Sequence, residues 1–291
     1  MLKYLLVSAS GAAGDEAVFA TALATGAPFA AHLAFLHVRL DITETAVAMT
    51  SGGAGGAMAV QNVLDQLESE SRQNEARVAA QVEAFCRRHG LPLAAAPVAP
   101  ASGGPSAELL LRVGSASRCV AEHGRFADLL VVGRAHGEED LALDVLEAAL
   151  MDTGRPVLIA PAQPPASLTG TAVIAWKDTR EAARAVAAAM PLLERASRVV
   201  ILTVQEEGAR PGEVVEPLAQ ALRWHNLDVS CRTLTPAGRH PAEELLQAVH
   251  DEGACLLVMG AYSHSRLREV VFGGFTQRIL RSADLPALMA H

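Results

Sequence analysis

The fold is decided by Leu256-Leu257-Val258-Met259-Gly260-Ala261-Tyr262-Ser263-His264, an apolar run that stops at a glycine and continues as a polar loop. Downstream, Gly273-Gly274 open a helix-like segment, and Pro286-Ala287-Leu288-Met289 has the character of one more strand. A buried strand, a loop and a helix N-terminus together favour phosphate binding, because glycines admit the anion and the first helical N–H groups face it. The stretch therefore predicts an anion-binding corner in an α/β fold.

The chain repeats this pattern, which indicates two domains. The run 127–133 (ADLLVVG) echoes 254–260 (ACLLVMG), and 154–158 (GRPVL) echoes 284–288 (DLPAL). Residues 162–167 form the clearest linker, so we expect domains at 1–165 and 166–291. Each half alternates strands with short crossover helices, which predicts a mostly parallel sheet covered by helices on both faces. We expect two separate sheets rather than one continuous sheet.

The expected elements follow from apolar periodicity and turn residues. In the first half we expect strands at 2–7, 31–38, 108–113, 128–133 and 156–160, and helices at 15–25, 61–89, 115–123 and 141–152. In the second half we expect strands at 171–176, 199–204, 228–234, 255–259 and 286–290, and helices at 179–193, 212–225, 241–250 and after Gly273. The glycine run 52–56 is interpreted as a surface loop, because no lysine follows it.

Composition excludes several classes of protein. The net charge of −8 and the scattered arginines argue against a nucleic-acid partner. No apolar stretch is long enough for a membrane span or a signal-peptide core. The four cysteines show no Cys-x-x-Cys spacing and are expected to be reduced thiols, which favours a cytoplasmic location.

The spacing Gly260-x2-Ser263-x9-Gly273-Gly274 resembles the nucleotide loop of the universal stress protein family, whose ATP-binding members usually have Gly-x2-Gly-x9-Gly-Ser/Thr. Two positions depart from that pattern, since Ser263 replaces a glycine and Gly274 replaces the hydroxyl residue. The resemblance extends over the second half and, more weakly, over the first. It implies a tandem of two Rossmann-like, doubly wound sandwiches, each with a five-stranded mostly parallel sheet flanked by helices.

The resemblance also implies a stress-response protein that binds an adenine nucleotide (ATP, ADP or AMP) in its second half, with no metal beyond nucleotide-bound Mg. The residues that it assigns to the nucleotide site are Ala175, Trp176, Lys177, Val204, Met259, Gly260, Ser263, His264, Gly273, Gly274, Phe275 and Thr276. Lys177 stands where the family usually has an acid near adenine, and lysine cannot accept a hydrogen bond from the adenine amino group. Lys177 is instead a candidate partner for phosphate or for Asp178.

The corresponding loop of the first half differs in length and charge. It spans ten residues from Gly133 to Leu143, against thirteen from Gly260 to Gly273, and it lacks the two late glycines. Three consecutive acids, Glu138-Glu139-Asp140, would repel phosphate. We therefore expect that the first half does not bind nucleotide phosphate.

No catalytic signature accompanies the loop, so we expect no enzymatic activity. The sequence has no Walker lysine loop, no Gly-x-Ser-x-Gly motif and no His-Glu-x-x-His motif. No pair of its histidines has a spacing that indicates a metal site. Two hypotheses stay open, a nucleotide-binding stress protein and a non-enzymatic interaction module with decayed sites; a nucleotide-hydrolysing enzyme ranks third. Members of the family that the sequence resembles commonly pair through the last strand of the sheet. The resemblance therefore implies that the edge strands 156–160 and 286–290 pack the two halves on each other, since an exposed edge needs covering. A homodimer is left open.

Overall fold

The computed structural model describes residues 1–42, 46, 57–94, 103–134, 140–204, 215–235, 238, 240–261 and 274–291. The first half contains β1 (Tyr4–Ser8), α1 (Asp15–Gly26), η1 (Ala27–Phe29), β2 (His32–Arg39), α3 (Ala57–His89), β3 (Ser106–Val113), α4 (Ala116–Gly124), β4 (Leu129–Val132), α5 (Asp140–Met151) and β5 (Val157–Ile159). The second half contains β6 (Thr171–Ala175), α6 (Arg180–Leu193), β7 (Arg198–Val204), α7 (Glu216–Arg223), β8 (Val229–Leu234), α8 (Pro241–Asp251), β9 (Ala254–Gly260), α9 (Gly274–Ser282) and β10 (Ala287–Ala290). The alternating α/β order expected from the sequence is confirmed.

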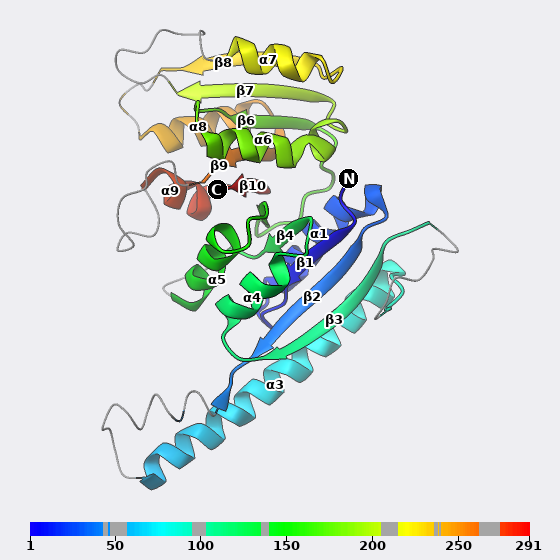
Figure 1. Cartoon of the computed structure of the whole chain (residues 1–291), viewed down its shortest axis with the longest axis vertical. Helices are drawn as coiled ribbons and strands as arrows, with labels where there is room; N and C mark the ends of the chain where they lie inside the picture. The colour runs from blue at the N-terminus through cyan, green and yellow to red at the C-terminus, as the bar shows by residue number, and fades with distance from the viewer. Residues whose placement is uncertain are drawn as a thin grey trace.

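The strands form one ten-stranded sheet in the order β3-β2-β1-β4-β5-β10-β9-β6-β7-β8 (Figure 1). Each half contributes five strands in the same relative order, and within each half neighbouring strands are parallel. Among the described strands, only β5 and β10, at the junction, pair antiparallel. The expected α/β fold with five strands per half is confirmed, but the expectation of two separate sheets is wrong.

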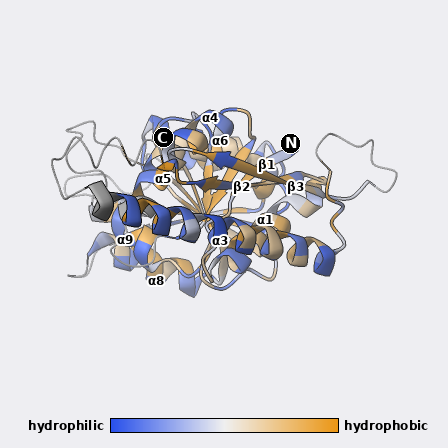
Figure 2. Ribbon diagram, turned by 90° about the horizontal axis from the view of Figure 1, so that it is seen from below, coloured by the Kyte–Doolittle hydropathy of each residue, from blue (hydrophilic) through white to orange (hydrophobic). Residues whose placement is uncertain are grey.

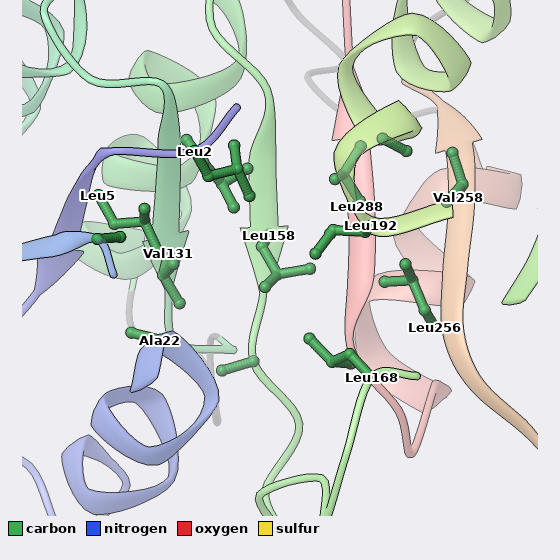
Figure 3. Packing of buried hydrophobic residues seen from close by; sticks show 14 of the residues in the cluster. Leu2, Leu5, Ala22, Val131, Leu158, Leu168, Leu192, Leu256, Val258 and Leu288 are labelled. Carbon is green, nitrogen blue, oxygen red and sulfur yellow. The ribbon is translucent and has the colours of Figure 1, made fainter. Parts of the chain in front are cut away.

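The two sheets merge because each ends in an edge strand that needs a partner. An unpaired edge exposes backbone N–H and C=O groups, and here each edge satisfies the other, with Leu158 opposite Leu288. The apolar core continues across this junction. Figure 3 shows Leu158 and Leu288 beside Leu168 of the connecting segment and Leu192 of α6. The expected packing of the edge strands 156–160 and 286–290 on each other is therefore observed.

Helices cover both faces of the sheet. Side chains of α1, α3, α6 and α7 share one apolar cluster with alternate strand residues, whereas side chains of α4, α5, α8 and α9 share a second cluster on the other face. The alternation is visible in β4, where Val131 belongs to the first cluster and Leu130 and Val132 to the second. Figure 2 shows hydrophobic strands between helices with hydrophilic outer residues.

Local sequence explains where several helices begin and how α3 packs. The Thr179 hydroxyl accepts a hydrogen bond from the backbone N–H of Ala182 at 3.2 Å, so Thr179 is the N-cap of α6. The long helix α3 buries Val78, Val82 and Phe85, which recur at helical spacing. The observed ends of helices and strands differ from the expected ends by up to four residues. Sequence patterns locate an element better than they locate its first and last residues.

Candidate functional site at the strand ends of the second half

The carboxyl ends of β6, β7 and β9 lie side by side. In the sheet register Ala175 at the end of β6 pairs with Leu202 of β7 on one side and with Met259 of β9 on the other. The backbone N–H of Trp176 continues this pairing by donating to the carbonyl of Leu202 at 2.8 Å. From β6 the chain proceeds to β7 on one side, while β9 and β10 lie on the other, so the strand order reverses between β6 and β9. Ligands of open parallel sheets bind at such a reversal.

The structure brings six of the twelve predicted site residues to this edge. They are Ala175, Trp176, Lys177, Val204, Met259 and Gly260. Three others, Gly274, Phe275 and Thr276, form the first turn of α9. Ser263, His264 and Gly273 lie outside the described residues, as does most of the loop that carries them.

Trp176 and Lys177 have different surroundings although they are neighbours in the turn after β6. Trp176 packs partly against the apolar cluster on the α6 side of the sheet. Its indole Nε1 is buried and has no hydrogen-bond partner among the described residues, which is unusual for a buried donor. Lys177 is exposed. The turn therefore offers one cation and one unsatisfied donor beside the strand ends.

The first turn of α9 presents mainly backbone rather than side chains. Gly274 is exposed, and a Cβ built on it would meet nothing within 4 Å. Thr276 is only 8% exposed, and Phe275 packs partly against the cluster on the α8 and α9 side. The side chains of Phe275 and Thr276 thus contribute to packing, while the open space lies at Gly274.

Gly260 is required for packing as well as being a candidate for binding. A Cβ at this position would lie 2.5 Å from the backbone N of Ala182 and 2.8 Å from the carbonyl carbon of Glu181. The first turn of α6 therefore touches the end of β9, and no side chain fits between them. This contact explains the glycine without reference to a ligand.

A buried carboxylate stands in that same first turn. Glu181 is 4% exposed and accepts a hydrogen bond from Arg180 Nε at 2.5 Å. Burial acts to raise the pKa of Glu181, but hydrogen bonds from Arg180, from its own backbone N–H and from Thr179, with the positive charge of Arg180, outweigh it and lower the pKa. The carboxylate is therefore ionised at neutral pH, and the turn carries both signs of charge.

The equivalent turn of the first half is filled by its own side chains. Asp15, at the first position of α1, is 4% exposed and accepts hydrogen bonds from the backbone N–H of Gly11 and from Ser10 Oγ, both at 2.7 Å. The turn residues that precede α1 contain no acid, and Asp15 supplies one from inside the helix. Its carboxylate binds the Gly11 N–H and the Ser10 hydroxyl, two donors at the carboxyl end of β1.

Helix α3 closes this turn from outside. Asn74 Nδ2 donates to the carbonyl of Ser10 at 2.9 Å, and Arg77 Nε donates to the carbonyl of Gly11 at 3.0 Å. Gly11 has φ +86°, and a Cβ on it would lie 1.8 Å from Asn74 Oδ1. Sequence reasoning missed Asp15, which an acid in the first turn of a helix could have signalled, and missed Asn74 and Arg77, for which no local signal exists.

The described residues contain neither a cluster of metal-ligating side chains nor a membrane-spanning helix. Within it, no group of three or more histidine, cysteine, aspartate or glutamate side chains is placed to hold a metal ion. No helix in the same residues combines the length and apolar character needed to cross a bilayer.

The second half of the chain is similar in sequence to known proteins. Residues 169–291 match the model of the universal stress protein family. A universal stress protein of Synechocystis sp. is 39% identical over 49 residues, which are 17% of this chain and 17% of that protein. One of Methanocaldococcus jannaschii is 29% identical over 49 residues, 17% of this chain and 30% of that protein. The matched segment thus spans less than a third of either relative.

Similarity over the whole chain is seen at the level of structure. The crystal structure of a universal stress protein from Archaeoglobus fulgidus superimposes with a TM-score of 0.70, covering 99% of this chain and 97% of that one. The sequences are 14% identical, so this likeness shows the fold alone. Residues 169–291 therefore match the universal stress protein family, and the remainder of the chain shares the fold of that family.

Proposed function

We propose that this protein is a non-enzymatic stress-response protein whose second half, residues 166–291, binds an adenine nucleotide (ATP, ADP or AMP). The observation that carries the proposal is the convergence of Ala175, Val204 and Met259–Gly260 at the strand-order reversal. Residues 1–165 form the other unit, in which Asp15 and α3 fill the equivalent position.

The chemistry of the second half suits an anion with a flat base. The backbone at Gly274 begins α9 in open space, so its N–H groups can face phosphate oxygens. Lys177 is exposed at the neighbouring turn and adds a positive charge. The buried Nε1 of Trp176 beside it has no partner among the described residues. Any Mg would arrive with the nucleotide, since the described residues of the proposed site include no group placed to hold a metal ion.

A second function, a protein-interaction module that no longer binds nucleotide, is favoured by one observation. Gly260 is needed by α6 whether or not a ligand binds, because the Ala182 backbone N lies 2.5 Å from any Cβ there. The family-like glycine could therefore persist after nucleotide binding is lost.

Thermal shift and calorimetry with ATP, ADP and AMP separate the two functions. A nucleotide at about 100 times its Kd should stabilise the folded protein by about 2.7 kcal/mol. Gly274→Leu should remove this effect, because the new side chain enters the open space, whereas folding should be unaffected. Gly14→Leu is the matched control, since Gly14 precedes α1 in equally open space. No shift with any of the three nucleotides would favour the interaction module.

Lys177→Glu distinguishes phosphate pairing from adenine pairing at the same site. If Lys177 faces phosphate, the variant should weaken ATP more than AMP, because ATP carries more negative charge. If the position faces adenine, the new carboxylate should accept a hydrogen bond from the adenine amino group and raise the affinity for all three nucleotides.

A further inference from the structure

The two outer edges of the ten-stranded sheet differ in their exposed side chains, although at each edge an arginine donates to a backbone carbonyl. At the β8 edge, Arg223 Nη2 donates to the carbonyl of Val229, and the four exposed side chains from Ser230 to Thr233 include Arg232. Polar and charged side chains of this kind discourage another strand from pairing. The β3 edge carries Leu111 at 40% exposure and Val113 at 53% exposure instead.

Hydrogen bonding shows which backbone groups of β3 are available. Ser106 and Gly114 donate to β2 residues, so even-numbered residues of β3 face β2. Ala107 exchanges both of its backbone hydrogen bonds with residues 92–94, on the opposite side of the strand. Leu109, Leu111 and Val113 therefore direct their N–H and C=O groups outward, and no described residue accepts from these three N–H groups. Leu111 O accepts from Arg112 Nη1 at 2.8 Å and keeps a second lone pair.

We propose that the edge of β3 from Leu109 to Val113 pairs antiparallel with the same segment of a second copy of this chain, around a two-fold axis at Leu111. Each of the three outward-facing residues then exchanges hydrogen bonds through its outward-facing N–H and C=O groups with the second copy. The pairing extends the sheet as the β5–β10 junction does inside the chain.

The side chains of this segment are complementary to themselves under that symmetry. Leu111 lies opposite Leu111 of the second copy, and Leu109 lies opposite Val113, all on the α3 face of the sheet. On the other face Arg112, which also donates to His123 Nε2 at 2.9 Å, lies opposite Leu110 rather than opposite another arginine. Apolar cross-strand pairs of this kind stabilise antiparallel sheets. A closed two-fold interface of identical patches is the commonest form of oligomer.

Light scattering coupled to size exclusion tests the pairing in the full chain. The wild type should have twice the mass of the 30.4 kDa chain, and Leu111→Lys should return it to a single-chain mass, because the new charge lies on the two-fold axis. Thr233→Lys, on the opposite edge, is the matched control and should remain a dimer. Circular dichroism should be unchanged in both variants, since both positions are exposed. The melting temperature should be unchanged in Thr233→Lys and should lose its dependence on protein concentration in Leu111→Lys, because association stabilises the folded chain.

Disulfide trapping tests the register. Directly opposed residues in a hydrogen-bonded antiparallel pair have Cα atoms about 5.5 Å apart, which suits a disulfide. Leu111→Cys in a Cys231→Ser background should form a covalent dimer on mild oxidation, whereas the wild type, with exposed Cys231 on β8, should not. A wild-type protein of single-chain mass at every concentration would overturn the pairing and leave this edge to a strand of another protein. A dimer that survives Leu111→Lys would overturn it equally.

Discussion

The turns that follow β1 and β6 occupy equivalent places in the two halves but differ in their described surroundings. After β1, the carboxylate of Asp15 takes the N–H of Gly11, and Asn74 and Arg77 of α3 bond to the turn carbonyls. After β6, Lys177 is exposed and the indole Nε1 of Trp176 has no described partner. The two halves thus keep the same strand order although the corresponding turns differ in their hydrogen bonds.

The strand-ending glycines give the largest expected difference between the halves. Gly260→Ala places a Cβ 2.5 Å from backbone, so α6 must shift, and we expect a loss of about 3 kcal/mol in the free energy of unfolding. A Cβ at Gly133 would lie 3.1 Å from Val18 Cγ2 and, among the described residues, would meet no other atom so closely. The Val18 side chain can adjust, so Gly133→Ala should lower the free energy of unfolding by less than about 1 kcal/mol. Urea denaturation measures both. Equal losses would show that α6 and β9 are less tightly joined than the structure indicates.

The buried acids of the two turns sharpen the comparison. Asp15→Ala leaves the N–H of buried Gly11 without its partner and should cost about 1–3 kcal/mol. Glu181→Ala frees Arg180, whose side chain is 73% exposed and can be hydrated, so this loss should be smaller. The same denaturation experiment compares the two variants. A larger loss for Glu181→Ala would contradict the idea that the first turn depends more on its acid.

Glu181 also predicts a specific pH dependence. Its pKa is lowered in the folded protein, so its ionised form stabilises the fold above the ordinary value of 4.5. That stabilisation is lost as the pH falls through the lower folded value. The melting temperature of the wild type should therefore exceed that of Glu181→Gln at pH 7 and converge with it in acid. A difference that stays constant from pH 7 to acid would exclude the carboxylate as its source.

Sequence patterns predicted the fold well because its signals are local. Apolar runs such as Leu256–Met259 and caps such as Thr179 act within a few residues. The repeated strand-ending glycine indicated that the chain contains two copies of the same pattern of strands and helices. The junction was predicted in part, since both edge strands were identified from the family resemblance. Its consequence, one continuous sheet, depends on a pairing between residues 158 and 288 that no local pattern encodes.

The candidate site was less accessible to sequence reasoning. Register now places Ala175 beside Met259, as strand-end binding requires, but the roles of the twelve residues stay predictions. Gly260 illustrates the difficulty, because a glycine kept for helix contact looks the same in sequence as one kept for phosphate. Closure of the first half depends on Asn74 and Arg77, which are more than sixty residues from the turn they cover.

The smallest expected effect comes from removing that cover. Asn74→Ala with Arg77→Ala deletes hydrogen bonds from side chains at the surface, so the loss of stability should be about 1 kcal/mol or less. Nucleotide stoichiometry in calorimetry should stay at that of the wild type, because the Asp15 carboxylate still occupies the Gly11 N–H and still repels phosphate. Adding Asp15→Ala to the pair removes this last obstacle and serves as the comparison. If the double variant already binds a second nucleotide, α3 is the barrier and Asp15 is not. If a second nucleotide binds only to the triple variant, the Asp15 carboxylate itself excludes the ligand from the first half.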